Sequence, residues 1–203
     1  MRLNVPIILT LSRIAVIPVF VLVYYLPVSW SNEACTWLFV LAALTDWADG
    51  HIARRYDLAS AFGAFLDPVA DKLMVAVVLI LLVDRNPTDY GAIWLAIPAA
   101  VIVGREITIS ALREWMAGIG ETTKVAVSTI GKVKTTAQLV ALPFLIYRDD
   151  LFGVIPVVDI GFVLLYVAAL LTIWSMTLYL RGAWPVLKRG VSPTPVSGRP
   201  PSP

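Results

Sequence analysis

The chain has 203 residues, of which 59% are hydrophobic and 15% are charged, with a formal net charge of +2. Soluble domains carry about 25% charged residues, so this composition excludes an ordinary soluble domain and predicts an integral membrane protein. The only cysteine, Cys35, excludes an intramolecular disulfide.

Six apolar segments approach the length of about 20 residues that a membrane-spanning helix needs. They cover residues 7–28, 34–48, 65–83, 91–112, 125–147 and 152–180. The second segment is short unless its helix continues through Asp46 and Asp49, and the last is too long for one untilted span. The predicted fold is therefore an all-α bundle of six transmembrane helices in one domain, residues 1–189. Residues 190–203 are rich in Pro and Ser and predict a disordered tail.

Basic residues are distributed unevenly among the predicted loops. If the N-terminus lies inside, the outer loops 29–33, 84–90 and 148–150 contain only Arg85 and Arg148 as basic residues. Because cytoplasmic loops carry the excess of Lys and Arg, both termini are predicted to be cytoplasmic. The same topology brings the acids of the second and third helices and the bases of the fourth and fifth to the cytoplasmic side.

Four aspartates lie at the ends of the second and third segments. Residues three or four positions apart share one face of a helix. Two such stripes occur here, one formed by Asp46, Asp49, Gly50 and Ala53 and the other by Gly63, Asp67 and Asp71. If residues 55–61 turn the chain back, the stripes face each other. Ionisable groups at membrane depth are costly and usually functional, so we interpret this cluster as a site rather than as helix caps or surface charges.

The composition of this cluster indicates which ligand it would hold. Four carboxylates with no cysteine and a single nearby histidine favour Mg²⁺ or Mn²⁺ over zinc. Two such ions can hold a diphosphate, offset its charge and stabilise the leaving oxygen. Gly50 and Ala53 leave room for a bulky group against the helix, and the guanidinium of Arg54 can bind a phosphate. Further bases predict a separate site for a second anionic group: Arg105, Arg113, Lys132 and Lys134.

The spacing of the acidic cluster resembles the signature of the CDP-alcohol phosphotransferase family: Asp46-x-x-Asp49-Gly50-x-x-Ala53-Arg54-x(8)-Gly63-x-x-x-Asp67-x-x-x-Asp71. Stretches at residues 4–13, 63–72, 104–115 and 131–135 resemble members that use glycerol 3-phosphate, and the similarity covers about residues 1–182. The resemblance implies transfer of a phosphatidyl group from CDP-diacylglycerol to the 1-hydroxyl of glycerol 3-phosphate, with release of CMP. It also implies a homodimer in the bacterial inner membrane, with the active site facing the cytoplasm; we expect no nucleic-acid partner.

The resemblance implies a role for each motif position. It implies that the two metal ions are bound by Asp46, Asp49, Asp67 and Asp71. It gives Asp71 a second role, as the general base that acts on the acceptor hydroxyl. The groups around CDP-diacylglycerol would be Gly50, Ala53, Arg54 and Ser60. From charge alone, we assign the glycerol phosphate to Arg105, Arg113, Lys132 and Lys134, although two lysines two positions apart diverge on a helix.

Several alternatives stay open. The acceptor could be inositol phosphate, serine or a second phosphatidylglycerol; the inner bases favour a phosphorylated acceptor but do not separate glycerol phosphate from inositol phosphate. A polyprenyl transferase also uses aspartate pairs with Mg²⁺. A cation-coupled transporter would use the acids as a relay, but transporters often show repeats and broken midplane helices. For single residues, Arg105 and Glu106 could form a structural ion pair, and we interpret Lys72 as a snorkelling or pairing charge.

Overall fold

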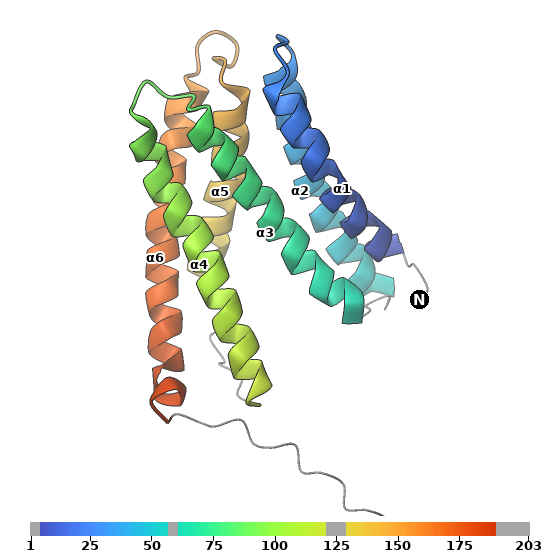
Figure 1. The fold of residues 1–203 in the computed structure, drawn as a ribbon, viewed down its shortest axis with the longest axis vertical. Coiled ribbons are helices and arrows are strands. Elements are labelled where there is room, and N and C mark those ends of the chain that lie inside the picture. Colours follow the sequence, from blue (N-terminus) through green and yellow to red (C-terminus); the bar gives the residue numbers. More distant parts are fainter. Residues whose placement is uncertain (1–4, 57–60, 121–128, 190–203) are drawn as a thin grey trace, which may run out of the picture.

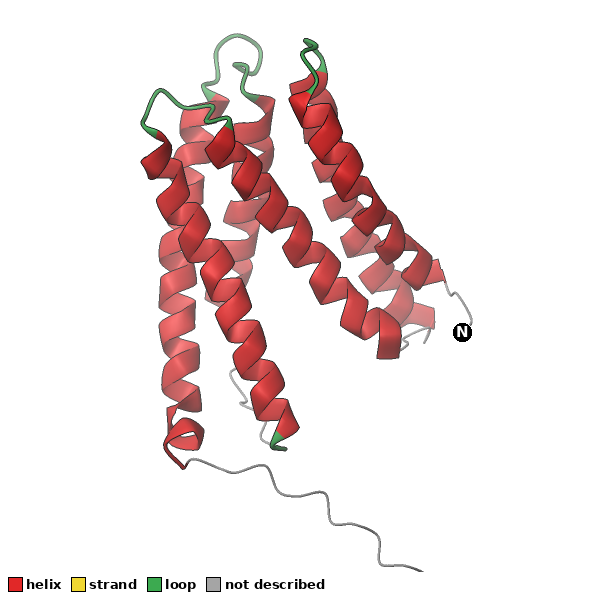
Figure 2. Cartoon of the chain, viewed as in Figure 1, coloured by secondary structure: helices red, strands yellow, loops and turns green. Residues whose placement is uncertain are grey.

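The computed structural model describes residues 5–56, 61–120 and 129–189, with only the backbone described at 5–7, 47–56, 61–65, 67–68, 129–132 and 189. Within these ranges the chain forms six helices and no strand (Figure 2): α1 (Val5–Tyr25), α2 (Ser31–Tyr56), α3 (Ala61–Asp84), α4 (Ala92–Gly118), α5 (Thr129–Tyr147) and α6 (Val157–Arg189). Successive helices run in opposite directions (Figure 1). The predicted all-helical bundle is confirmed for this part of the chain.

Several helix ends differ from the predicted segments; the sixth helix, for example, ends at Arg189 rather than at residue 180. The second helix continues to Tyr56 and so carries Asp46 and Asp49, and the fourth continues to Gly118. Both extensions contain charged residues. A search for apolar segments does not detect helical turns of this kind, because it ends where the apolar residues end. The sixth helix starts later than predicted, at Val157, because residues 151–155 form a tight turn in which Phe152 and Gly153 have positive φ.

The described helices have the surface of a membrane protein. Three of them contain a stretch long and apolar enough to cross a membrane: Ile8–Tyr25 in α1, Ala92–Gly118 in α4 and Val157–Lys188 in α6. Large apolar side chains also point outward, such as those of Leu22, Trp37 and Leu170. Soluble monomers rarely expose contiguous apolar surface on this scale, so the outer face of the bundle suits a lipid environment.

The core is packed toward one end of the bundle, which we call the loop end because it carries the connections 26–30, 85–91 and 148–156. The buried cluster there includes Phe20, Leu79, Leu95, Leu145 and Leu165. At the opposite end, which we call the open end, α1, α2 and α3 diverge from α4 and α6 (Figure 1). A smaller apolar cluster around Met116 and Ala183 joins α4 to α6 there. The main core thus holds the helices together at the loop end, and the helix axes diverge toward the open end (Figure 1).

The two arginines predicted for the outer loops are used to join helices at the loop end. Arg148 Nη2 donates to the hydroxyl of Tyr24 at 2.7 Å and to the backbone oxygen of Arg85 at 2.6 Å. The Tyr24 hydroxyl in turn donates to the backbone oxygen of Leu81 at 3.1 Å. The Arg85 side chain also donates, from Nη1, to the backbone oxygen of Tyr24 at 3.3 Å. These bonds connect α1, the end of α3 and the end of α5, so both arginines have a structural role.

Helices α5 and α6 approach each other closely at Gly161. A Cβ atom at this position would lie 3.0 Å from the Ala141 carbonyl oxygen and equally near side-chain atoms of Phe144 and Leu145. Small residues allow such close approach between membrane helices. We expect Gly161→Ala to lower the free energy of unfolding by about 1–3 kcal/mol, measured as the unfolding midpoint in detergent. A Cβ at Gly104 on α4 would meet no described atom within 4 Å, so Gly104→Ala should not lower the midpoint; equal losses in both variants would contradict this packing.

Candidate active site

A cavity of about 430 Å³ opens between α3, α4 and α5. This volume falls within the range of small-molecule sites. Its charged lining comes from three helices: Asp71, Lys72, Arg105, Glu106, Arg113 and Lys134. The rest of the lining is mostly apolar. The cavity thus combines an apolar wall, suited to a lipid chain, with a cluster of cations and two carboxylates.

Asp71 also lines a second, narrower cavity of about 20 Å³, together with Arg13 from α1 and Asp46 from α2. Arg13, which is almost fully buried, donates to the Asp46 carboxylate. The fold therefore brings one carboxylate of α2 and one of α3 to the wall of the same small cavity. Asp71 is accessible and stands where this space meets the large cavity.

The small cavity fits a hard cation by its donor chemistry. Carboxylate oxygens are the ligands that Mg²⁺ and Mn²⁺ prefer, and about 20 Å³ is room for roughly one water-sized group. Asp49 lies one turn from Asp46 in α2, and Asp67 one turn from Asp71 in α3. The described residues contain no group of three or more possible metal ligands. The side chains of Asp49 and Asp67 lie outside the described atoms, so their role as ligands stays a prediction.

Other predicted site residues also fall wholly or partly outside the described atoms. Gly50, Ala53 and Arg54 lie in the last turns of α2, where only the backbone is described. Only the backbone is described for Lys132 as well, in the first turn of α5. Ser60 lies outside the described residues. The assignments of these five positions stay predictions.

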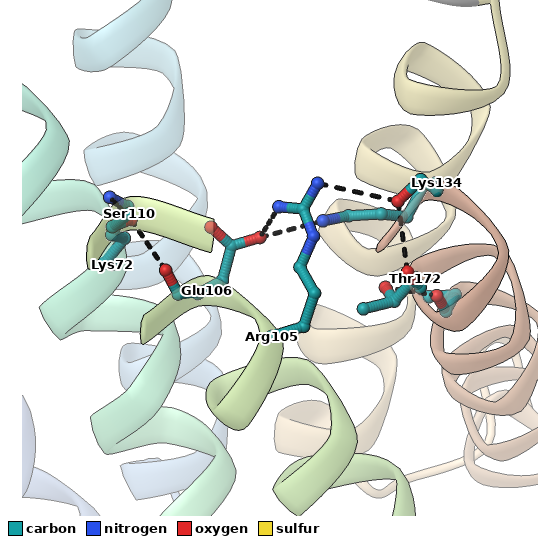
Figure 3. Close-up of polar contacts among 8 residues, drawn as sticks. Lys72, Arg105, Glu106, Ser110, Lys134 and Thr172 are labelled. Carbon is teal, nitrogen blue, oxygen red and sulfur yellow. Dashed lines mark hydrogen bonds and ion pairs between the residues drawn. The ribbon is translucent and has the colours of Figure 1, made fainter. Parts of the chain in front are cut away.

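Glu106 holds two of the predicted acceptor-binding cations together. Its Oε1 accepts from Arg105 Nη1 at 2.7 Å and from Lys134 Nζ at 2.8 Å (Figure 3). Arg105 Nη2 also reaches Ser175 Oγ of α6 at 3.5 Å, whereas its Nε is buried with no hydrogen-bond partner among the described atoms. The ion pair considered from the sequence is present, and it lies on the cavity wall.

Arg113 lies on the same cavity wall, nearly two helical turns beyond Glu106 on α4. Its guanidinium carbon is 5.4 Å from the centre of the Tyr179 ring of α6. An aromatic face attracts a guanidinium at this range and limits where the arginine can point. Three of the four predicted acceptor-binding bases are therefore brought to one cavity.

Sequence reasoning missed the polar contacts between α3 and α4. Lys72 Nζ donates to Ser110 Oγ, and Ser110 Oγ donates to the backbone oxygen of Glu106 at 2.6 Å (Figure 3). Lys72 is therefore part of the cavity wall rather than a charge that reaches the membrane surface. Gln138, one turn after Lys134 on α5, is buried and lines the same cavity. The spacing of four residues in Glu106–Ser110 and Lys134–Gln138 is the signal that could have identified both polar residues.

Comparisons with known proteins show which family the chain is similar to. A family model described as CDP-alcohol phosphatidyltransferase matches residues 3–174, which contain every lining residue of both cavities. Proteins from Escherichia coli (strain K12) and Shigella flexneri, each named CDP-diacylglycerol–glycerol-3-phosphate 3-phosphatidyltransferase, are similar along most of their length. Each is 52% identical over 183 residues, which cover 90% of this chain and 96% of the relative.

Proposed function

The chain belongs to the CDP-alcohol phosphatidyltransferase family, and from this premise we propose that it transfers the phosphatidyl group of CDP-diacylglycerol to glycerol 3-phosphate, releasing CMP. The names of the relatives that share half of its residues support this reaction. The observation that carries it is the cavity in which Asp71 lies together with Arg105, Arg113 and Lys134. A carboxylate that can take a proton thus faces cations that can hold a phosphorylated acceptor.

The acidic end of the site is proposed to bind two divalent ions, Mg²⁺ or Mn²⁺, through the carboxylates of Asp46, Asp49, Asp67 and Asp71. Ions bound there would hold the diphosphate, offset its charge and stabilise the departing CMP. The small space lined by Asp46 and Asp71, with the oxygen donors around it, supports a divalent ion at this position; the position of the second ion rests on the spacing of Asp49 and Asp67 alone. Arg13 orients Asp46 by its ion pair. Gly50, Ala53, Arg54 and Ser60 are proposed to contact the cytidine diphosphate part of the donor.

Asp71 is proposed to act as the general base. It would remove the proton from the 1-hydroxyl of glycerol 3-phosphate while that oxygen attacks the phosphorus atom attached to diacylglycerol. A new phosphorus–oxygen bond then forms, the diphosphate bond breaks, and CMP leaves with the bonding electrons. A base must lie within hydrogen-bond reach of its proton, and Asp71 lines both the acidic cavity and the cation-lined cavity.

The acceptor phosphate is proposed to bind Arg105, Arg113 and Lys134, with Lys132 one turn or less away. Charge-assisted hydrogen bonds to phosphate are stronger than neutral ones, and a buried donor without a partner is costly. The Nε of Arg105 is such a donor among the described atoms. Lys72, whose ammonium group lies on the same cavity wall, adds to the positive potential.

The membrane arrangement is also a proposal. All six helices would span the bacterial inner membrane as part of a homodimer, with both termini and the open end of the bundle in the cytoplasm. The bias of Lys and Arg between the loops supports this orientation. The apolar wall of the cavity supports entry of the donor lipid from the bilayer.

An acceptor panel tests the proposed reaction and its metal requirement. Purified protein is incubated with CDP-diacylglycerol, Mg²⁺ and one of glycerol 3-phosphate, inositol phosphate, serine or phosphatidylglycerol, and the CMP released is measured. We expect rapid release with glycerol 3-phosphate alone. Excess EDTA should reduce the rate at least about 100-fold, because the ions contribute several kcal/mol to the transition state, and added Mg²⁺ or Mn²⁺ should restore it. A higher rate with another acceptor, or full activity in EDTA, would reject the corresponding part of the proposal.

A further inference from the structure

Glu106 is a carboxylate of the large cavity that the proposed reaction does not use. Both of its hydrogen bonds to cations fall on one oxygen, Oε1, which accepts from Arg105 and from Lys134. Among the described residues, none donates a hydrogen bond to Oε2. The Glu106 side chain is 25% exposed, so a molecule in the cavity can reach it. A charged oxygen in this setting has room for a hydrogen-bond donor supplied by a ligand.

Glu106 lies on the cavity wall between two groups of polar side chains. In Figure 3 its carboxylate stands between the Lys72–Ser110 pair on one side and the side chains of Arg105 and Lys134 on the other. Lys72 and the proposed base, Asp71, both belong to α3 and both line this cavity. A ligand that stretches from Arg105 and Lys134 toward α3 would therefore pass Glu106.

Glycerol 3-phosphate has the chemistry that this arrangement requires. Its phosphate is at one end, the reacting 1-hydroxyl is at the other, and the 2-hydroxyl lies between them. With the phosphate on the cations and the 1-hydroxyl at Asp71, the 2-hydroxyl falls at the level of Glu106. We propose that Glu106 is a specificity-determining residue, whose Oε2 accepts a hydrogen bond from the 2-hydroxyl of the acceptor. This inference rests on the proposed function, because it concerns the acceptor of that reaction.

The bridge from Glu106 to Arg105 and Lys134 also permits a simpler role, in which the carboxylate only positions the two cations. The two roles differ in how they depend on the substrate. Loss of a positioning role weakens every acceptor that has a phosphate, whatever its other groups. Loss of a hydrogen bond to the 2-hydroxyl weakens only acceptors that have this hydroxyl, because sites built to bind a hydroxyl discriminate strongly against analogues that lack it.

The test crosses one substitution with one change in the substrate. Wild-type protein and E106Q are assayed for kcat/KM with glycerol 3-phosphate and with 3-hydroxypropyl phosphate, the analogue without the 2-hydroxyl. For the wild type we expect the analogue to react about 100-fold less efficiently. E106Q should reduce kcat/KM for glycerol 3-phosphate about tenfold more than for the analogue, because a hydrogen bond to a neutral amide is weaker than one to a carboxylate. E114Q, the same change on an exposed part of α4, should leave both values unchanged.

An equal loss with both acceptors would overturn the inference and leave Glu106 with a positioning role alone. Absence of CMP release from the wild type with glycerol 3-phosphate would instead overturn the proposed function. If E106Q does not fold, as judged by size-exclusion chromatography and thermal unfolding in detergent, E106D replaces it. The shorter side chain keeps the charge but withdraws the carboxylate, so the same unequal loss is expected, and an equal loss again rejects the inference.

Discussion

Asp71→Asn is expected to reduce kcat about 1,000-fold while leaving the KM for glycerol 3-phosphate within a few-fold of the wild-type value. Positioned general bases contribute about 10²–10⁴ to the rate, and asparagine has nearly the shape of aspartate but cannot take the proton. Asp71 is the described carboxylate that lines both cavities. The acceptor phosphate binds elsewhere in the proposal, at the cations, so its affinity should be little affected. The measurement is initial CMP release at saturating CDP-diacylglycerol.

Two controls separate the proposed roles of Asp71. Asp159→Asn makes the same change in the first turn of α6, at the loop end, and should leave kcat unchanged. Titration with Mg²⁺ distinguishes a base from a pure metal ligand, because a weakened ligand set can be saturated by more metal whereas a missing base cannot be replaced. Recovery of kcat at high Mg²⁺, or near-normal turnover in a folded variant, would contradict the base role.

Lys134→Met is expected to raise the KM for glycerol 3-phosphate about 10- to 100-fold and to leave the KM for CDP-diacylglycerol within about threefold. Lys134 is 6% exposed, and its ammonium group is held by Glu106 at 2.8 Å on the cavity wall. A hydrogen bond to a charged group contributes about 1.5–3 kcal/mol, which corresponds to this range. The methionine side chain is apolar and about as long as the aliphatic part of the lysine side chain, so packing along α5 should be preserved.

The control for this prediction is Lys188→Met near the end of α6. Lys188 is exposed and lies over the Trp184 ring, away from both cavities, so both KM values should stay at the wild-type level. An equal rise in the KM for both substrates of Lys134→Met would remove Lys134 from the acceptor site. Such a result would indicate a general change in the shape of the cavity instead.

Hydropathy and motif spacing predicted the parts of this fold that depend on local sequence. The six apolar stretches correspond to the six helices of the described residues. Three of these helices are long and apolar enough to cross a membrane, where the backbone must satisfy its own hydrogen bonds. The same signal could not predict that α2 continues to Tyr56 or that α6 starts at Val157. The first boundary depends on polar turns, and the second depends on a tight turn around Phe152 with positive φ.

In the site, too, the residues along one helix could be predicted from the sequence, whereas the contacts between helices could not. Asp71 could be identified from its spacing along α3, and the structure places it beside Asp46 of α2. The contacts of Lys72 with Ser110 and of Glu106 with Lys134 could not be predicted, because they depend on how α3 and α5 are rotated against α4. Spacing fixes which residues share a face of one helix, whereas the pairing of faces is set by packing between helices.

The central claim is that the phosphatidyl group passes to the acceptor held in the cavity and not to water. The most direct measurement follows purified protein in lipid nanodiscs with CDP-diacylglycerol and radiolabelled glycerol 3-phosphate, and quantifies CMP and labelled lipid in the same samples. We predict equal amounts of CMP and labelled phosphatidylglycerophosphate at all times, and no CMP when glycerol 3-phosphate is omitted. CMP release that continues without the acceptor and yields phosphatidic acid would contradict the account.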